Sequence, residues 1–269
     1  MLSKLMKHEL RATGRIMLPL YLLVIVSSAL ANISTRFFME SDHDFLNLLG
    51  ILLLTVFVLA IMAMCVMAFV LMIQRFYKSL LQDEGYVMMT LPVSVHQHVW
   101  CKLLTSLLWY IGAAAVSALA IVILVFDIDF VKQITRFFGD LVEMLPKLDM
   151  DALHIVVFAF EMLLFILVGA AASCLLFYAA LSIGHSFPNH KLLLSVAFYF
   201  GIQFGMQFVF GALTLLLSTL EPLPMFASFD EASIYIHVVM LALTLGTALV
   251  GALFYFLCTY FLKNRINLD

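Results

Sequence analysis

The sequence predicts an all-α integral membrane protein with six transmembrane helices, an N-terminal interfacial amphipathic helix and a helical cytoplasmic loop. Of the 269 residues, 65% are hydrophobic and 12% are charged, and the charges gather in short gaps between long apolar runs. A helix needs roughly 20 apolar residues to cross a bilayer. Because the spans use up the chain, we expect residues 1–269 to form a single transmembrane domain. The predicted spans cover residues 16–31, 45–73, 103–126, 154–181, 192–217 and 234–262.

The charges in the gaps predict the side of the membrane on which each gap lies. Lys and Arg in short loops resist translocation, so the side with more of them is cytoplasmic. Ten of the 14 basic residues lie in gaps that share a side with both termini, and four lie in the others. We therefore expect a multi-pass protein of a bacterial-type plasma membrane, with both termini in the cytoplasm.

Two segments outside the spans have amphipathic patterns. Residues 1–15 put apolar and basic side chains on different helical faces, which predicts a helix along the cytoplasmic leaflet; a frayed basic tail that only sets topology is the alternative. The external loop, residues 127–153, contains an apolar stripe within Phe130 to Leu145 that predicts a helix on the outer leaflet or over the bundle. The basic face of the first segment consists of Lys4, Lys7, His8 and Arg11.

The predicted cytoplasmic loop, residues 74–102, has signals for two helical pieces around a turn. The first piece continues the second span, and Gly85 is placed to end it as a C′ glycine. Pro92 breaks the chain, because the residue before a proline avoids the α region. Ser94 and Gln97 then form a capping-box pattern at the start of a new helix.

Apolar side chains in this loop have two interpretations that stay open. Exposed to the cytosol, they make a docking surface for a partner. Alternatively, they lie in the headgroup region of the membrane. These residues are Phe76, Tyr77, Tyr86, Val87, Met88 and Met89.

The loop sequence Asp83-Glu84-Gly85-Tyr86 … Thr90-Leu91-Pro92-Val93-Ser94, together with the basic N-terminal segment and six spans, resembles the permease subunits of ATP-binding-cassette exporters of the second type, the ABC type-2 permease family. In that family a stretch of this kind forms or flanks the coupling helix that sits in a groove of the ATPase. The resemblance covers the layout of the whole chain, and its specific motif is residues 83–94. It implies a transmission region made of Asp83, Glu84, Gly85, Tyr86, Leu91, Pro92 and Ser94.

The resemblance also implies partners. They are two ABC ATPase subunits, a second permease copy or sibling permease, and membrane lipid. The chain has no Gly-x-x-x-x-Gly-Lys-Ser/Thr sequence, so we expect it not to be an enzyme and to bind no cofactor, with ATP and Mg on the partner ATPase. The implied function is to move a hydrophobic or amphipathic cargo out of the cytoplasm or inner leaflet, with the loop acting as a lever.

Glu161 is the formally charged residue inside the predicted spans, where an ionisable group needs a partner or water. His154 lies seven residues earlier on the same helical face, near the outer end. One interpretation is a cargo contact or gate. The other is a structural carboxylate, protonated or hydrogen-bonded between helices.

The fifth span has two distinct faces. Gln203, Gln207 and Thr214 lie on one side, and Gly201 and Gly205 point to the other. The polar row predicts a cargo pathway together with Glu161, and the glycine pair predicts a dimer seam with close helix approach. Ordinary packing within one subunit is the alternative for both.

Other functional classes receive less support. An ion-coupled secondary transporter using Glu161 is the alternative function, although no inverted repeat or pair of broken helices is detectable. An intramembrane enzyme needs paired ionisable groups in the spans, whereas the predicted spans contain a single acid, Glu161. His185 and His190 are too sparse for a metal site and are expected in a solvated cytoplasmic turn. No basic tract indicates nucleic acid.

Overall fold

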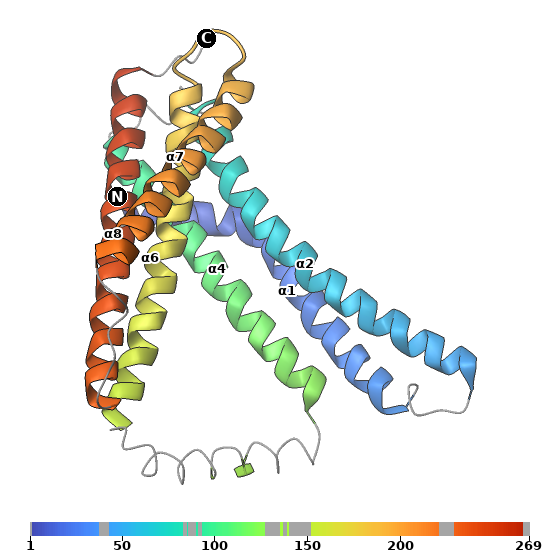
Figure 1. Ribbon diagram of the computed structural model, residues 1–269. Helices are drawn as coiled ribbons and strands as arrows, with labels where there is room; N and C mark the ends of the chain where they lie inside the picture. Colours follow the sequence, from blue (N-terminus) through green and yellow to red (C-terminus); the bar gives the residue numbers. More distant parts are fainter. Residues whose placement is uncertain are drawn as a thin grey trace. The chain divides into compact units, whose positions relative to one another are not determined.

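The described part of the chain is built of long α-helices (Figure 1). A computed structural model describes residues 2–37, 43–82, 85, 90, 93–126, 135–136, 139, 152–220 and 229–265. The helices are α1 (Leu2–Phe37), α2 (Asp44–Leu80), α4 (Val95–Val125), α6 (Ala152–Gly184), α7 (Lys191–Leu220) and α8 (Phe229–Asn264).

In the part of the chain that the structure describes, six helices are long and apolar enough to cross a membrane. They coincide in number and order with the six predicted spans, and they identify the chain as a multi-pass membrane protein by length and composition. The helices extend beyond the apolar runs at several ends because the flanking polar residues are also compatible with helix. Residues 75–80, for example, continue α2 as the sequence predicts.

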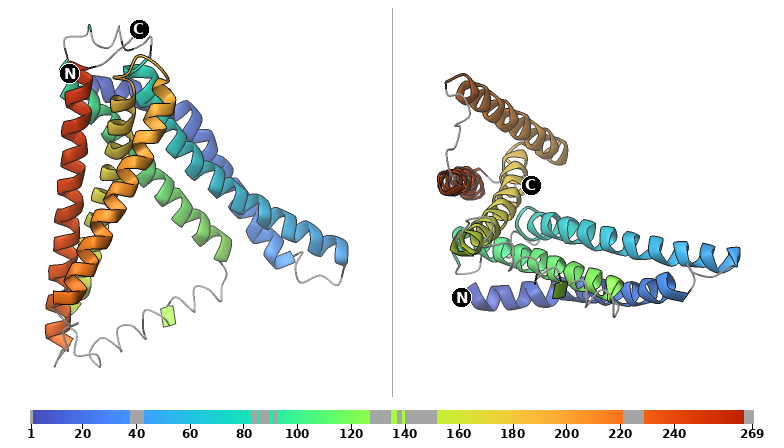
Figure 2. Two further views of the ribbon diagram at one scale, coloured as in Figure 1. Left: turned by 45° about the horizontal axis from the view of Figure 1, so that its top comes forward. Right: turned by 60° about the horizontal axis from the view of Figure 1, so that its bottom comes forward.

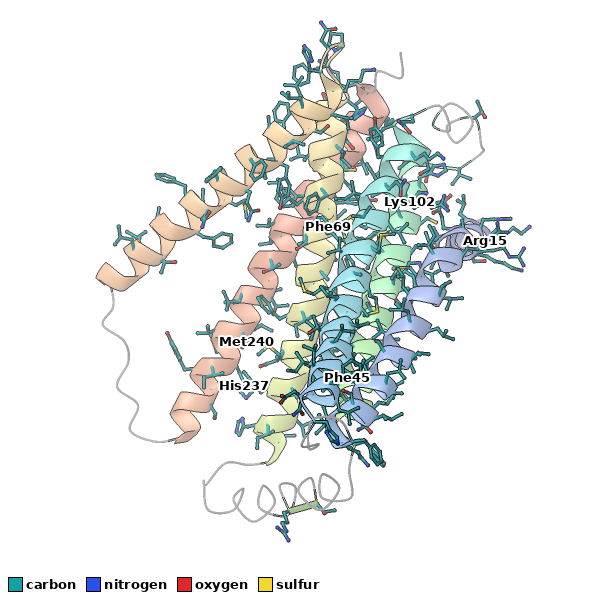
Figure 3. The ribbon with its side chains drawn as sticks, turned by 90° about the vertical axis from the view of Figure 1, so that its right-hand side faces the viewer. Arg15, Phe45, Phe69, Lys102, His237 and Met240 are labelled. Atoms are coloured by element: carbon teal, nitrogen blue, oxygen red, sulfur yellow. The ribbon has the colours of Figure 1, made fainter. Side chains whose placement is uncertain are left out.

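The predicted interfacial helix is not a separate element. α1 runs without a break from Leu2 to Phe37, so residues 2–15 and the first span share one helix. Figures 1 and 3 show its ribbon changing direction near Arg15. Pro19 lies inside the helix and cannot donate to the carbonyl of Arg15, and Thr13 bonds back to the carbonyl of Glu9 at 2.8 Å. Both features bend a helix without ending it.

The chain divides into two compact units. Unit 1 comprises residues 1–75 and 100–141, and unit 2 comprises residues 76–99 and 142–269. The division falls inside α2 and inside α4, so the ends of these helices that flank the predicted cytoplasmic loop belong to unit 2. Both helices therefore continue from one unit into the other.

In unit 1, α1, α2 and α4 pack together, and the right-hand view of Figure 2 shows the three helices side by side. Asn32 of α1 donates to the carbonyl of Leu124 at 2.8 Å, and Trp109 donates to Thr13 at 2.7 Å, so α1 and α4 run parallel. Ser34 donates to the carbonyl of Gly50 at the start of α2. The core between the helices contains Val24, Ala31, Phe57, Ala60, Met64, Ala113 and Ala120.

In unit 2, α6 packs against α8 along its whole length and against α7 over part of it. The start of α6 meets the start of α8 at His154 and His237, and the two ends meet at Ser182 and Cys258, so these helices run parallel. Figures 2 and 3 show α7 diverging from α6 toward its C-terminal end. Residues of all three helices line a groove.

Two predicted features lie outside the described residues. The external amphipathic helix within Phe130 to Leu145 falls almost entirely there, since residues 135, 136 and 139 alone are described. Most of the turn in the predicted cytoplasmic loop falls there too, although Gly85, Thr90, Val93 and Ser94 are described. Gly85 has no positive φ and α2 ends at Leu80, so the predicted C′ glycine is wrong.

Candidate functional site

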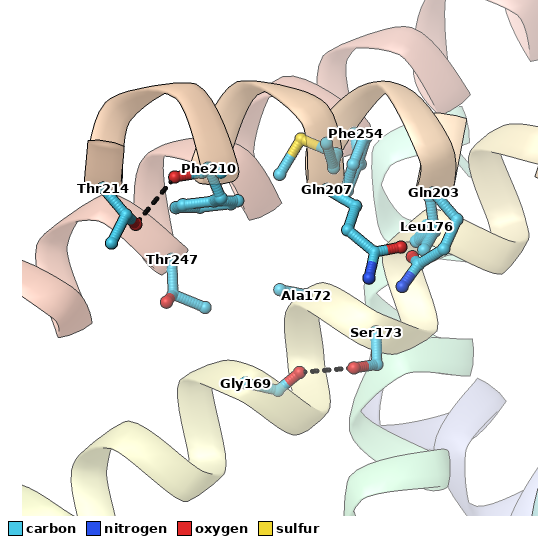
Figure 4. A pocket seen from close by; sticks show the side chains of 12 residues that line it. Gly169, Ala172, Ser173, Leu176, Gln203, Gln207, Phe210, Thr214, Thr247 and Phe254 are labelled. Carbon is cyan, nitrogen blue, oxygen red and sulfur yellow. Dashed lines mark hydrogen bonds between the residues drawn. The ribbon is translucent and has the colours of Figure 1, made fainter. Parts of the chain in front are cut away.

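A groove of about 580 Å³ lies between α6, α7 and α8 (Figure 4). Gln203, Gln207 and Thr214 line it from α7, so the structure brings the predicted polar row to one place. The carboxamides of both glutamines point toward α6 in Figure 4. The other lining residues are Gly169, Ala172, Ser173, Leu176, Met206, Phe210, Gly211, Thr247 and Phe254.

The polar groups of this groove are uncharged. Ser173, Thr214 and Thr247 each donate their hydroxyl hydrogen to a carbonyl four residues earlier, at 2.8 Å in every case. Their oxygen lone pairs therefore stay available as acceptors. The carboxamides of Gln203 and Gln207 add both donors and acceptors. The groove suits a neutral amphiphile that carries N–H or O–H groups, and its volume falls in the range of small-molecule sites.

Glu161 does not line the groove and has a different partner. Nδ1 of His237 of α8 forms a hydrogen bond of 2.7 Å with Glu161 Oε2. Nε2 of His237 lies 3.1 Å from Nδ1 of His154, and the two rings stack with centroids 5.3 Å apart. His154 and Glu161, which the sequence places on one face of α6, are thus joined through a residue of α8. We call Glu161, His237 and His154 the carboxylate–histidine chain.

His237 was not among the residues predicted from the sequence. It lies inside the predicted sixth span, where an ionisable side chain needs a partner or water just as Glu161 does. The side chains of Glu161 and His237 are 16% and 18% exposed, so each shields the other from the apolar surroundings. Figure 3 shows His237 on α8 where this helix lies beside α6.

Both stems of the predicted cytoplasmic loop pack within unit 2. Phe76, near the end of α2, stacks on Tyr178 of α6. His96, in the first turn of α4, hydrogen-bonds to Tyr255 of α8 at 2.7 Å. Phe76 is fully buried, so its interpretation as a loop residue open to cytosol or headgroups is wrong.

Two of the predicted transmission residues are described. Ser94 caps α4, because the Gln97 N–H points to its Oγ at 3.4 Å and to its carbonyl at 2.9 Å. This agrees with the predicted capping pattern. Gly85 is buried and donates to the carbonyl of Gln82 at 2.7 Å. The remaining ones, Asp83, Glu84, Tyr86, Leu91 and Pro92, lie outside the described residues.

The turn between α6 and α7 is more tightly packed than the sequence indicates. His185 is 2% exposed, hydrogen-bonds through Nδ1 to the carbonyl of Leu181 at 2.9 Å, and meets the ring of Tyr77 edge-on. Its expected solvation is therefore wrong, whereas His190 is exposed as expected. Burial lowers the pKa of His185, and nearby Lys191 adds to this effect.

A buried ion pair connects α1 to α4 in unit 1. Lys102 is the last residue of the predicted cytoplasmic loop. It is 4% exposed and bonds to Glu9. Trp109 and Thr13 extend the contact by one turn along α1 and about two turns along α4. This pair fixes the N-terminal segment of α1 against α4.

Gly201 and Gly205 lie apart from these sites. A Cβ added at either position meets no atom within 4 Å of the described chain, and both residues are exposed. The predicted seam therefore lies on a face of α7 that the described residues leave uncovered.

Within the described residues, no group of three His, Cys, Asp or Glu side chains is arranged to hold a metal ion. In comparisons with known proteins, no family model, curated protein or solved structure matches the chain. The class that the fold and the site define is thus a multi-pass α-helical membrane protein with an uncharged groove and a separate carboxylate–histidine chain.

Proposed function

We propose that this protein is the transmembrane subunit of an ATP-driven exporter of the ABC type-2 permease kind, powered by a separate ATPase. The observation that carries the proposal is the packing of both loop stems on the helices that form the groove. Phe76 contacts α6 and His96 contacts α8. A partner that pushes on residues 74–102 thereby acts on the groove through short side-chain contacts.

The course of α2 and α4 supports the same lever. Each helix belongs to unit 2 at its loop end and to unit 1 over the rest of its length. Helices are stiff over such lengths, so a displacement at the loop passes into both units. The motif at residues 83–94 resembles a coupling region. The loop that contains it lies on the predicted cytoplasmic side of the membrane, where an ATPase subunit would bind.

The groove supports a neutral amphipathic cargo. Its lining combines Gln203, Gln207 and three hydroxyl oxygens with apolar side chains, and no charged residue contributes to it. A fully ionised cargo has no counter-charge there, and desolvating an unpaired charge costs several kcal/mol. Peptide-like, drug-like or lipid-like molecules with hydrogen-bond donors meet this requirement.

The test begins with purification of the tagged protein from its native membrane in mild detergent. We expect an ATP-hydrolysing subunit to accompany it at about one per permease chain. Glu84→Ala combined with Tyr86→Ala should release that subunit. Leu249→Ala is the control, because Leu249 is 72% exposed on α8 and lies far along the chain from the loop. Recovery of the protein alone, or release by the control as well, contradicts the proposal.

The cargo site has its own test in the intact complex. Gln207→Leu should lower the stimulation of ATPase activity by neutral amphiphiles about tenfold, the effect of losing about 1.4 kcal/mol of cargo binding. Phe208→Leu is a matched control on the neighbouring residue of α7, which is 80% exposed and does not line the groove. Equal effects of the two substitutions would count against the groove.

An ion-coupled secondary transporter is the second candidate. The hydrogen bond between Glu161 and His237 favours it, because a carboxylate held beside an imidazole is suited to exchange a proton. The two functions differ in their energy source. Transport that stops on addition of a protonophore while ATP stays high supports the carrier, and transport that continues supports the exporter.

A further inference from the structure

The carboxylate–histidine chain has a geometry that specifies where its protons can lie. When Glu161 is ionised its carboxylate only accepts, so Nδ1 of His237 then carries the hydrogen of the 2.7 Å bond to Glu161. Nδ1 of His154 and Nε2 of His237 lie 3.1 Å apart. A hydrogen bond between them requires a hydrogen on one nitrogen and a lone pair on the other. Both requirements are met when the imidazoles are neutral and each carries its hydrogen on Nδ1.

One further proton fits into this chain while the heavy atoms stay in place. It enters at Nε2 of His154, and the Nδ1 hydrogen of His154 then passes to Nε2 of His237. The Nδ1 hydrogen of His237 passes in turn to Glu161. The products are a neutral carboxylic acid and two neutral imidazoles whose hydrogens now lie on Nε2. The chain has taken up one proton, which neutralises the negative charge of Glu161, and no bond between heavy atoms has changed.

The positions of the three residues give this transfer a direction. His154 is the third residue of α6, and Glu161 lies seven residues further along, about 10 Å deeper at 1.5 Å per residue. His154 is partly exposed, and no described residue bonds to its Nε2. The chain therefore begins at a helix end and finishes inside a predicted span.

Among the described residues of α6, α7 and α8, few other titratable groups lie near this chain along the helices. α7 has Lys191 and Tyr199, both in the half of the helix that adjoins the end of α6. On α6 the remaining groups, Cys174 and Tyr178, are also toward that end. On α8, Tyr235 is the nearest group, and the side chains of Asp230 and Glu231 lie outside the described residues.

We propose that Glu161, His237 and His154 form a proton-binding relay in which His154 takes up a proton at the end of α6 and His237 passes it to the carboxylate of Glu161. Hydrogen-bonded imidazoles conduct protons by this alternation of donor and acceptor roles. The relay does not rest on the exporter proposal, because proton uptake by these side chains is independent of any ATPase.

The experiment follows protonation of Glu161 in the purified full-length protein in lipid nanodiscs. Infrared difference spectra between about pH 8 and about pH 5 should show the carbonyl band of a protonated carboxyl. Glu161→Gln should remove this band. A difference spectrum that is the same in the wild type and in this variant overturns the proposal.

A rapid pH jump distinguishes a relay from a structural cluster. His154→Ala should slow the rise of the Glu161 band at least tenfold, and added imidazole should restore the rate by replacing the missing ring. His154→Gln keeps the size of the side chain and should also be slow, which guards against misfolding of the alanine variant. Tyr235→Phe is the matched control and should keep the wild-type rate. Wild-type kinetics in both His154 variants overturn the relay.

Discussion

Phe76 and Tyr178 stack face to face, with ring centroids 4.1 Å apart and an angle of 8° between the planes. Both side chains are fully buried. Phe76 belongs to the end of α2, beside the predicted cytoplasmic loop, and Tyr178 belongs to α6, which carries part of the groove. The contact therefore joins the end of α2 to a helix that lines the groove, through two rigid aromatic rings.

Phe76→Ala should destabilise unit 2 by about 3–5 kcal/mol, because it removes a buried ring and leaves a cavity. In the assembled complex it should also reduce cargo-stimulated ATPase activity more than basal activity. The thermal unfolding midpoint of the purified protein and the two ATPase rates are the measurements. Phe45→Ala, on the same helix but 74% exposed, is the control and should change neither. An unchanged midpoint in Phe76→Ala would show that the stack contributes little.

Glu9→Ala should destabilise unit 1 by about 3–5 kcal/mol, since it leaves the buried ammonium group of Lys102 without its counter-ion. The double variant Glu9→Leu with Lys102→Met should recover most of this loss, because neither buried charge remains. Thermal unfolding of the three proteins in the same detergent provides the comparison. Equal destabilisation in the single and double variants would mean that packing, and not charge, governs this contact.

His185 should make unit 2 less stable in acid. Its pKa in the folded protein is lowered from 6.5 by burial. Above pH 6.5 the ring is neutral whether the chain is folded or unfolded, and its contribution to stability is complete. As the pH falls below 6.5, the unfolded chain binds a proton that the folded chain does not, so the free energy of unfolding falls by up to about 1.4 kcal/mol per pH unit.

The measurement for His185 is the thermal unfolding midpoint as a function of pH, in the wild type and in His185→Gln. The difference between the two curves isolates the contribution of His185, because all other residues are the same in both proteins. The wild type should lose more stability than the variant between about pH 6.5 and about pH 5.5. Parallel curves would show that His185 takes no part in the acid response.

Gly205→Leu should dissociate a permease dimer if α7 supplies the seam. The added side chain begins in open space within the protomer, since a Cβ at this position meets no atom within 4 Å of the described chain. A change in oligomeric state would thus report on a contact between copies. Gly246→Leu on α8 is the matched control, because a Cβ there is equally unobstructed. Cross-linking in native membranes measures the outcome, and an unchanged dimer in Gly205→Leu excludes this seam.

The sequence by itself determined the six helices, their order and the cap at Ser94, because these depend on interactions between residues close together in the chain. A long apolar run has few alternatives to a helix in a membrane, since its backbone groups must be satisfied internally. The sequence also placed Gln203, Gln207 and Thr214 on one face of the fifth span, because the repeat of an α-helix is constant.

Only the tertiary structure decided which polar groups meet. Glu161 and His237 are 76 residues apart in the chain, and Glu9 and Lys102 are 93 apart. A helix that is apolar on every side has no distinct apolar face. Its sequence pattern therefore does not predict which face packs against a neighbouring helix. Burial and partner choice depend on contacts between segments that are distant in the chain. The packing of the helices therefore brings His237 to Glu161 and Phe76 to Tyr178. It also buries Lys102 and His185.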